Sequence, residues 1–282
     1  MTPAAPDHAK DPVRYDVYVV RCADGSLYTG VSPDADARIH AHNAGRGAKY
    51  TRSRLPVEPV FRERCADKSA ALRREREIKR LTREEKLRLV SGYESAHPAP
   101  VRAERLTDGD FRRMADLERS AYSDAFVTPP EEAARWYALH PESCVAYVSP
   151  DGGIAGFINL FPVRAETVRA LESGAFSDRM LRAEDILVPE DGRPYDLLFS
   201  CILTAVPWRG TGLAMRLVND ALDAYAPVLP SADRVWLDAS MKGGEHIALR
   251  LGMRFLRKTE QDTRLYAGMA KRFVREARAR RT

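Results

Sequence analysis

The stretch YDVYVVRCADGSLYTGVSPDADARIHAHN, residues 15–43, decides the fold of the first part of this chain. Two runs rich in β-branched and aromatic residues, 17–20 and 26–31, lie on either side of the turn sequence Ala-Asp-Gly at 23–25. This pattern is typical of a β-hairpin, because Asp-Gly readily adopts the tight turn that joins two antiparallel strands. The sequence therefore predicts two adjacent strands.

Groups suited to catalysis are brought together by this hairpin and the segment after it. Tyr18 and Tyr28 fall on neighbouring strands of the predicted hairpin. Asp34 is placed to cap the helix that follows. Arg38 and His42 are four residues apart, and this spacing puts them on one face of that helix. Phenol, guanidinium and imidazole, with a carboxylate further along the chain, are the groups needed to cleave a phosphodiester around a metal ion.

An ordered set of motifs over residues 14–90 resembles the GIY-YIG nuclease family. Val17-Tyr18-Val19 stands where the first family motif ends in tyrosine, and Tyr28-Thr29-Gly30 stands for the second. The similarity continues through Arg38, His42-Asn43, GAKYTR at 47–52, Pro56-Val57 and ALRREREIK at 71–79. The resemblance implies a small α/β domain with a three-stranded sheet that hydrolyses DNA as a metal-dependent endonuclease.

The resemblance implies a catalytic role for four side chains of the hairpin and its helix. Tyr18 and Tyr28 would supply active-site hydroxyls, although as isolated residues they read as aromatics that pack on a core. Arg38 would neutralise the charge that grows on the scissile phosphate. His42 would act as a second base or a phosphate donor, or could equally be solvated.

The resemblance also implies a metal ligand and phosphate contacts. Family position singles out Glu75 rather than Glu77 as the carboxylate that holds one Mg²⁺ or Mn²⁺, whereas the plain alternative is a solvated charged helix. A hard cation with one protein carboxylate and several waters is normal in phosphate chemistry. Lys49, Arg52 and Arg54 are expected to contact the nucleic-acid backbone without reading its sequence.

Composition places the chain among globular proteins with more than one domain. Its 282 residues exceed the usual single-domain size, and 44% hydrophobic residues are enough for packed cores. No apolar run approaches the length of a membrane span, and the first residues, with their prolines and charges, do not resemble a signal peptide. Four cysteines without a Cys-x-x-Cys pair favour reduced thiols in a cytoplasmic protein.

The charge is uneven along the chain. Residues 38–88 hold 16 Lys and Arg against 7 Asp and Glu, whereas residues 101–270 hold 20 against 25. Residues 271–282 are basic again, with 6 against 1. A basic first domain suits a polyanion such as DNA, although a solvated basic helix face would have the same composition.

The remaining elements of the first domain follow from periodicity and turn residues. A third strand is predicted over 56–64, and a loop precedes it over 45–54. Helices are predicted over 69–81, where Ser69 can cap, and over 83–90. These elements complete a GIY-YIG domain over 14–91.

A change of pattern separates the two halves of the chain. The segment GYESAHPAPV at 92–101 contains two prolines and is interpreted as a linker. Alternating helices and strands then predict a second domain with a mixed sheet over 102–270. Residues 271–282 are assigned to a basic tail.

A glycine-rich segment lies in the middle of the second domain. Val206-Pro-Trp-Arg-Gly-Thr-Gly-Leu-Ala214 joins a strand predicted over 197–206 to a helix predicted over 212–225. Backbone N–H groups in such a turn, together with the partial positive charge of a helix N-terminus, can bind a pyrophosphate. Alone, the segment could equally be a tight strand-to-helix turn.

This segment resembles the acyl-CoA loop of the GNAT N-acetyltransferases, whose pattern is Arg/Gln-x-x-Gly-x-Gly/Ala. Arg209, Gly212 and Ala214 stand at the matching positions, and the order strand, loop, helix, strand agrees. The resemblance covers 101–270 and implies an acetyl-CoA-dependent transferase in which the loop binds the cofactor. The cofactor-binding residues implied are Val206, Arg209, Gly210, Thr211, Gly212, Leu213 and Ala214.

Two positions depart from the GNAT pattern. One residue, rather than the usual two, stands between Pro207 and Arg209, so the strand is expected to bend differently from that of the family. Ala248 stands where the family usually has a tyrosine that protonates the leaving thiolate. Either another residue supplies this acid, the choices being His246, Ser240 and Tyr266, or the thiolate leaves without a protein acid. The candidate bases for the amine are Glu184, Asp196 and Asp238.

The sequence thus predicts a protein of α/β class with two α+β domains, a GIY-YIG endonuclease that cleaves DNA and a GNAT N-acetyltransferase. The acetyl acceptor would be an amine of a small molecule or a protein, and no membrane association is expected. One alternative is a nucleic-acid-binding module without cleavage that targets the acetyltransferase. The joint presence of Tyr18, Tyr28, Arg38, His42 and Glu75 argues against it. Another is a single acetyltransferase whose N-terminal part recognises its substrate.

Overall fold

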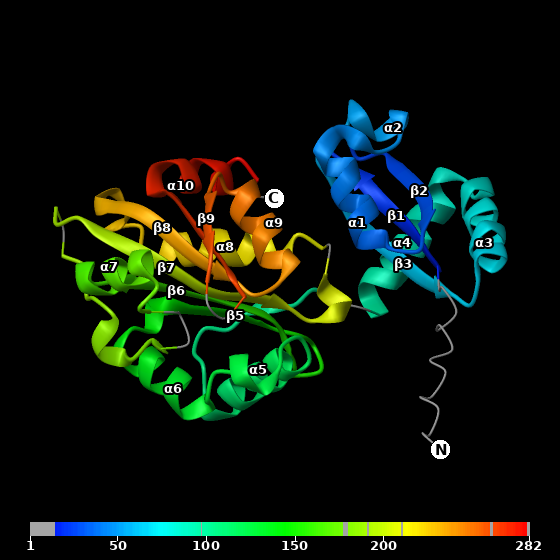
Figure 1. The fold of residues 1–282 in the computed structure, drawn as a ribbon. Helices are drawn as coiled ribbons and strands as arrows, with labels where there is room; N and C mark the ends of the chain where they lie inside the picture. The colour runs from blue at the N-terminus through cyan, green and yellow to red at the C-terminus, as the bar shows by residue number, and fades with distance from the viewer. Residues whose placement is uncertain are drawn as a thin grey trace, which may run out of the picture. The chain divides into compact units, whose positions relative to one another are not determined.

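The computed structural model describes residues 15–96, 98–176, 180–190, 192–209, 211–259 and 262–280. The chain divides into two compact units, Met1–Pro98 and Ala99–Thr282, called here the N-terminal and the C-terminal unit. Figure 1 shows the helices and strands of each unit. Among the described residues, no helix is long and apolar enough to pass through a bilayer.

The N-terminal unit is a three-stranded antiparallel sheet in the order β2-β1-β3 with helices packed on it. Tyr18 pairs with Gly30 and Val20 with Tyr28, so the predicted hairpin is confirmed. The elements are β1 (Tyr15–Cys22), β2 (Leu27–Ser32), α1 (Ala35–Ala41), a π-helical turn η1 (His42–Arg46), α2 (Lys49–Arg52), β3 (Val57–Cys65), α3 (Lys68–Arg80) and α4 (Arg83–Ala96).

The central strand β1 is apolar at almost every position because both of its faces are covered. Val17 and Val19 pack with residues of α3 and α4, including the fully buried Ile78. Tyr18 and Val20 point to the opposite face and pack with residues of α1. The alternation of a strand therefore divides the unit into two small cores and turns Tyr18 toward the helix that carries Arg38 and His42.

Three expectations for the N-terminal unit were wrong. Asp67, not Ser69, caps α3, because its side chain accepts a hydrogen bond from the backbone N–H of Ala70 at 2.7 Å. The predicted loop over 45–54 contains the short helix α2. Helix α4 continues to Ala96, so the first half of the segment predicted as a linker is helical, and its prolines come only after the helix has ended.

The C-terminal unit contains a seven-stranded mixed sheet in the order β4-β5-β6-β7-β8-β10-β9. Neighbouring strands are antiparallel except β7 and β8, which are parallel. The elements that form and cover it are β4 (Val101–Arg102), α5 (Asp108–Arg119), α6 (Pro130–Leu139), β5 (Cys144–Val148), β6 (Ile154–Val163), α7 (Ala165–Ser173), β7 (Tyr195–Thr204), η6 (Val206–Trp208), α8 (Leu213–Ala224), β8 (Ala232–Ala239), α9 (Lys242–Arg250), β9 (Arg254–Lys258), β10 (Arg264–Met269) and α10 (Ala270–Arg278).

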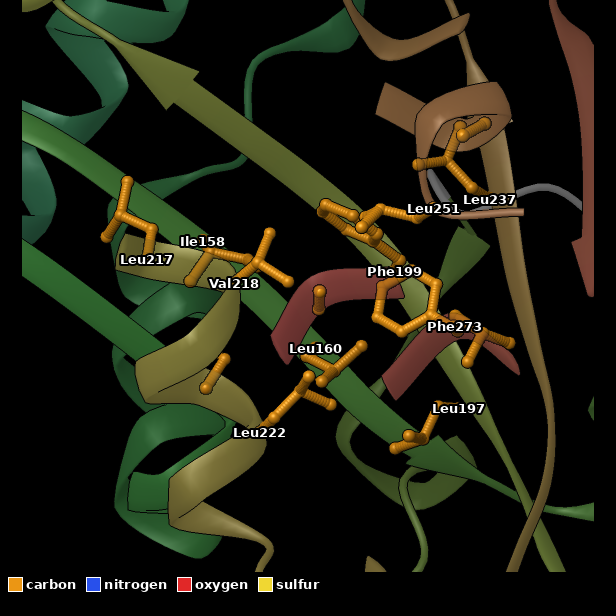
Figure 2. Packing of buried hydrophobic residues seen from close by; sticks show 14 of the residues in the cluster. Ile158, Leu160, Leu197, Phe199, Leu217, Val218, Leu222, Leu237, Leu251 and Phe273 are labelled. Atoms are coloured by element: carbon orange, nitrogen blue, oxygen red, sulfur yellow. The ribbon is translucent and has the colours of Figure 1, made fainter. Parts of the chain in front are cut away.

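Helices cover both faces of this sheet, which gives the unit two layers of core. Leu197 and Phe199 of β7 face α8 and α10, and Figure 2 shows Phe199 beside Phe273 of α10. Leu198, between them, faces the other side and packs in a cluster with Trp136 of α6. The predicted fold class is confirmed, with a small three-stranded sheet followed by a mixed sheet flanked by helices.

The parallel strands β7 and β8 separate half-way along β7. Their pairing ends at Phe199 and Leu237, although β7 continues to Thr204. Ser200 is an extra residue in the pairing of β7 with β6, a β-bulge that turns the strand at the point where it leaves β8. The last residues of β7 therefore pair with β6 on one edge and have no strand on the other.

Two further expectations for this unit are corrected. Most of the segment assigned to a basic tail is helix α10, whose apolar side contains Phe273 and Ala277 and packs into the core. The basic residues alternate with this apolar stripe at helical spacing. The charge of the segment, taken without the stripe, therefore suggests a solvated tail. Helix α7 was not predicted. The four cysteines are free, as expected.

Candidate active sites

An open hollow of about 400 Å³ lies on the N-terminal unit. It is lined by residues of β1, β2, α1 and α3 and by Pro33. The hollow brings together four of the side chains predicted to act in catalysis or metal binding: Tyr18, Tyr28, Arg38 and Glu75. The remaining lining residues are Tyr15, Gly30, Val31, Pro33, Lys68 and Leu72.

His42 does not line the hollow but lies directly behind Tyr18. It is fully buried, and its Nε2 is 3.1 Å from the Tyr18 hydroxyl. On the other side, Nδ1 is 2.6 Å from Oγ1 of Thr51. The imidazole is therefore neither solvated nor able to touch a phosphate directly, and it reaches the hollow only through the tyrosine.

The hydrogen bonds define which nitrogen of His42 carries the proton. Thr51 Oγ1 donates to the carbonyl oxygen of Ala48 at 2.9 Å, so it accepts from His42 Nδ1–H. The backbone N–H of Ala48 also points to Nδ1, at 3.4 Å, but the contact of Nδ1 with Thr51 is much shorter, at 2.6 Å, and decides the assignment. Nε2 then presents its lone pair to Tyr18, whose hydroxyl donates to it. This tautomer is inferred from the network.

The electrostatics keep this pair neutral at rest. Burial, helped by nearby Tyr28, raises the pKa of Tyr18 to about 12 despite the opposing effect of Arg38. Burial first, and then the charge of Arg38, lower the pKa of His42, so its imidazole stays neutral at neutral pH. A neutral imidazole hydrogen-bonded to a neutral phenol is an acceptor for the phenolic proton.

Two glycines leave room for this pair. A Cβ atom on Gly30 would lie 2.5 Å from the hydroxyl oxygen of Tyr18, which packs across it. A Cβ atom on Gly47 would overlap the ring and backbone of His42. The Tyr-x-Gly motif and the glycine after the first helix are therefore steric requirements of the tyrosine and the histidine.

The charged residues of α3 differ in whether they line the hollow. Glu75 lines the hollow and pairs with Lys79 at 2.7 Å. Glu77 does not line it and pairs with Arg74 instead. Lys68, which the sequence reasoning missed, also lines the hollow. It precedes Glu75 by seven residues, which is two helical turns, and this spacing could have revealed it.

The residues expected to contact phosphates fall into two groups. Lys49 and Arg52 are exposed on α2, and in the described part of the chain neither has a side-chain partner. Arg54 is already engaged, since it pairs with Asp24 at 2.9 Å, donates to the carbonyl oxygen of Tyr50 and lies over the Tyr50 ring. Arg54 braces the loop around α2.

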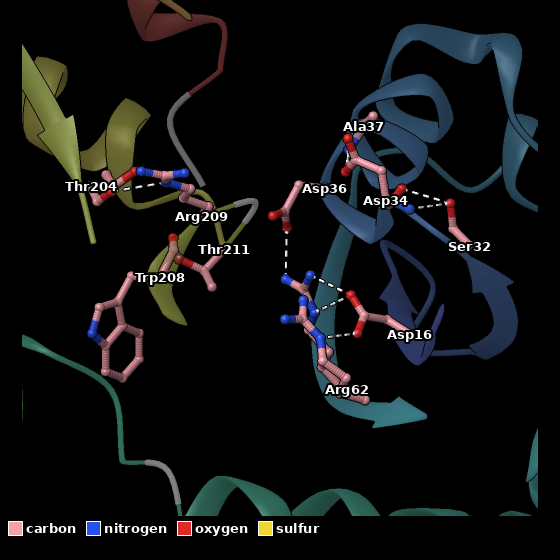
Figure 3. A network of polar contacts seen from close by, with 11 residues as sticks. Asp16, Ser32, Asp34, Asp36, Ala37, Arg62, Thr204, Trp208, Arg209 and Thr211 are labelled. Carbon is pink, nitrogen blue, oxygen red and sulfur yellow. Dashed lines mark hydrogen bonds and ion pairs between the residues drawn. The ribbon is translucent and has the colours of Figure 1, made fainter. Parts of the chain in front are cut away.

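An ion-pair network around the buried Asp16 fixes α1, the helix that carries Arg38 and leads into His42. Arg62 of β3 bonds Asp16 of β1 and Asp36 of α1, as Figure 3 shows. Arg64 adds a second bond to Asp16 at 3.0 Å. Burial of Asp16 alone would raise the pKa of its carboxyl, but the two arginines lower it below its usual value. The network thereby links β1 and β3 to α1.

Comparison with known proteins agrees with this geometry. A sequence model described as the GIY-YIG catalytic domain matches residues 14–88. A UPF0213 protein of Staphylococcus aureus (strain Mu3 / ATCC 700698) is 57% identical over 74 residues, which cover 26% of this chain and 90% of that protein. The chain belongs to the GIY-YIG family. The match lies within the N-terminal unit, called the GIY-YIG unit from here on.

Solved structures resemble each unit separately. The solution structure of the UPF0213 protein BH0048 from Bacillus halodurans is 46% identical and covers 28% of this chain and 83% of that chain, with a TM-score of 0.20. The GNAT-like decarboxylase GphF, in complex with isobutyryl-CoA, is 12% identical and covers 59% of this chain and 98% of that chain, with a TM-score of 0.45. The second likeness concerns the fold alone, so the chemistry of the C-terminal unit rests on its own residues.

A cavity of about 950 Å³ lies in the C-terminal unit where β7 and β8 separate. One part is lined by the end of β7, the end of β8 and the start of α9, including Ser200, Thr204, Ser240 and Gly244. Another part is lined by residues from α5, α6 and the segment between them. The cavity therefore joins the two faces of the sheet through the gap between the strands.

The glycine-rich loop begins α8 beside this cavity. Gly212 is the N-cap residue and has φ = +83°, a left-handed conformation that favours glycine. Arg209 and Ala214 line the cavity, and Figure 3 shows the Arg209 guanidinium against the carbonyl oxygen of Thr204. Leu213 is buried in the core, so only its backbone could meet a ligand. Gly210 lies outside the described residues.

The candidate acids and bases of this unit differ in whether they line the cavity. Ala248 is fully buried, and of its three possible substitutes only Ser240 lines the cavity. Tyr266 donates its hydroxyl to Glu245 at 3.1 Å. Among the candidate bases, Asp238 lines the cavity, whereas Asp196 accepts bonds from Trp236 and the backbone of Arg234, and Glu184 is exposed.

Glu118 is the cavity residue that the sequence reasoning missed. It is only 4% exposed and lines the cavity from the last turn of α5. Its spacing gives a signal in retrospect, because Phe111, Met114 and Glu118 follow the i, i+3, i+7 pattern of an apolar helix face. A carboxylate in an apolar position of an amphipathic helix is either paired or functional.

Proposed function

We propose that the GIY-YIG unit is a metal-dependent endonuclease that hydrolyses DNA. The observation that carries this proposal is the contact of Tyr18 with a buried neutral His42 at the edge of a hollow that also holds Arg38 and Glu75. A pure binding surface for nucleic acid needs exposed cations, and a buried imidazole hydrogen-bonded to a buried phenol, as in His42 and Tyr18, adds nothing to such a surface.

In this mechanism Tyr18 and His42 act as one proton acceptor. The attacking water gives its proton to the Tyr18 oxygen as the phenolic proton passes to Nε2 of His42. Thr51 holds Nδ1–H and so keeps Nε2 free for this proton. Arg38 and Lys68 face the hollow and neutralise the charge that develops on the phosphate. Tyr28 stacks on Tyr50 and shapes the wall next to His42.

The donor set fits one hard cation held by a single protein carboxylate. Glu75 is the acid that lines the hollow, and over the described residues no group of three or more metal-ligating side chains occurs. Magnesium bound in this way keeps several waters and takes its other ligands from phosphate. When bound, Mg²⁺ or Mn²⁺ supplies positive charge at the phosphate and the leaving oxygen.

The nuclease proposal is tested by replacing Glu75. Glu75→Ala in the full chain is expected to abolish Mg²⁺-dependent cleavage of branched, nicked and single-stranded DNA, while DNA binding stays close to that of the wild type. Glu77→Ala, two residues away on the same helix and outside the hollow, is the matched control and should cleave normally. Cleavage by Glu75→Ala equal to that of the wild type after stringent purification would refute the proposal.

We propose further that the C-terminal unit is an acetyl-CoA-dependent N-acetyltransferase. The supporting observation is the gap between β7 and β8 together with the loop that begins α8 next to it. The unpaired edge of β7 offers backbone groups to a pantetheine-like arm. The amide groups at the start of α8 can donate to a pyrophosphate, and Gly212 leaves the backbone accessible.

Binding of acetyl-CoA is the direct test of this proposal. Gly212→Glu would place a bulky carboxylate where the phosphates are expected and should remove most of the binding measured by isothermal titration of the full chain. Gly152→Glu is a matched control, because Gly152 also has a positive φ, of 82°, but lies in the turn between β5 and β6. Absence of binding to the folded wild type at millimolar acetyl-CoA would contradict the proposal.

A further inference from the structure

Two buried carboxylates point to the kind of acceptor that the C-terminal cavity takes. Glu118 is 4% exposed and Asp238 is 8% exposed, and both line the cavity. The arginines among the lining residues are exposed instead: Arg135, Arg182 and Arg209. The charged groups held away from water in this cavity are therefore acidic, within the residues that the structure describes.

Neither carboxylate is fully neutralised by its surroundings. Asp238 has one oxygen, Oδ1, that is buried and has no hydrogen-bond partner among the described residues. Glu118 accepts the backbone N–H of Thr128 at 2.7 Å, but in the described part of the chain no Lys or Arg forms an ion pair with it. For Asp238, a hydrogen bond from Thr263 and the charge of Arg257 offset part of the cost of burial. Glu118 has no ion pair among the described residues, and a buried carboxylate in that state is costly unless a ligand supplies the charge.

Several apolar side chains line the same part of the cavity as Glu118, beside the polar Thr128, Glu131, Glu132 and Arg135. Tyr122, Phe126 and Val127 line the cavity on the segment between α5 and α6, and Trp136 and Leu181 line it nearby. These side chains suit an organic body with little polarity. A cavity that combines apolar walls with a buried carboxylate is typical of sites that bind an organic cation.

We propose that this cavity binds a primary amine in its ammonium form on an apolar body, with Glu118 as the proton acceptor and Asp238 as a second anion. As an acceptor site the proposal rests on the acetyltransferase function above. Glu118 takes one proton from the ammonium, and the amine nitrogen then forms the C–N bond with the acetyl carbonyl. The C–S bond breaks, the second nitrogen proton goes to the departing sulfur, and the products are the amide and the CoA thiol.

The electrostatics of Glu118 suit this role. Burial raises the pKa of its carboxyl to about 7, although the hydrogen bonds from Thr128 and Cys201 and the charge of Arg119 oppose the shift. Cys144 of β5 also lies close enough to interact with it. The carboxylate form therefore increases as the pH rises through about 7, while an alkylammonium keeps its proton to about pH 10. Ammonium binding should tighten over that range.

The experiment uses phenethylamine as the probe and the full chain in isothermal titration. The wild type is expected to bind phenethylammonium, more tightly at pH 8 than at pH 6, and to bind neutral 2-phenylethanol much more weakly. Glu118→Gln should weaken binding about tenfold or more and remove its dependence on pH, because the charged hydrogen bond is lost. Asp238→Asn should weaken binding as well and serves as the second variant if Glu118→Gln fails to fold.

Asp116→Asn is the matched control, since Asp116 lies on the same helix, is exposed and pairs with Arg119. Equal phenethylammonium affinity in wild type and both cavity variants, or no binding to the folded wild type at millimolar phenethylammonium, would overturn the proposal. Acetyl-CoA titration of the same samples separates the two claims. If acetyl-CoA binds and the amine does not, the amine site fails; if the amine binds alone, acetyl transfer fails.

Discussion

Gly30 shows how one missing side chain can control the chemistry of the GIY-YIG unit. The Tyr18 ring lies across its backbone, so no other residue can stand opposite the tyrosine without moving it. The register of the hairpin, set by the turn between β1 and β2, places the glycine there. The motif residue with no functional group is thus as restrictive as the tyrosine itself.

A single methyl group at this position is a sharp test. Gly30→Ala is expected to displace the Tyr18 hydroxyl from His42 and lower the rate of DNA cleavage about 100-fold, the usual cost of misplacing a reacting group by about 1 Å. Single-turnover cleavage measures the effect. Gly92→Ala in α4 is the control, because a Cβ there meets nothing within 4 Å and an alanine favours the helix. Normal cleavage by Gly30→Ala would show that the tyrosine position is not critical.

The site residues that could be predicted from sequence are those whose neighbours in space are also close to them along the chain. Tyr18, Tyr28 and Arg38 lie on one hairpin and the helix after it, so turn chemistry and helical spacing already place them near one another. Lys68 and Glu118 have a helical spacing that gives a signal, but the hollow and the cavity that they line are completed by distant elements, so their surroundings could not be predicted. The burial of His42 depends on Thr51, and no periodicity of the first helix indicates that contact.

Helix α10 illustrates the same limit for an element. Its basic residues suggested a solvated tail, yet Phe273 and Ala277 are buried against β7, β8 and α8. Charge and apolar stripe occupy opposite sides of one short helix, and composition averages the two. Helix α4 escaped in part for a related reason, because Gly92 and the prolines after it suggested an earlier end than the structure has.

The contribution of α10 can be measured directly. Phe273→Ala should lower the free energy of unfolding of the C-terminal unit by about 3–5 kcal/mol, the usual cost of removing a buried phenylalanine from a packed core. Urea unfolding of the full chain followed by circular dichroism gives the value. Lys271→Ala, exposed on the same helix, should change stability by no more than about 0.5 kcal/mol. Similar effects for both substitutions would mean that α10 is peripheral.

The uneven charge of the whole molecule gives a prediction for DNA binding. Lys49 and Arg52 are exposed and unpaired among the described residues, so each is expected to contact one phosphate. The affinity for duplex DNA should fall with salt, and each alanine substitution should reduce the slope of log K against log salt by about 0.9. Arg88→Ala, on α4 and paired with Glu84, is the control and should leave the slope unchanged. An affinity that does not vary with salt would mean that the basic surface is solvated only.

The separation of β7 from β8 has a consequence for the exchange of backbone protons with solvent. Up to Phe199, β7 has a strand on each side, and its amides are held in the sheet. From Cys201 to Thr204 only the β6 side is paired among the described strands, so amides that point to β6 stay protected and those that point into the gap are open to water. Over these four residues, deuterium uptake should therefore alternate between slow and fast, and a ligand in the gap would make it uniformly slow.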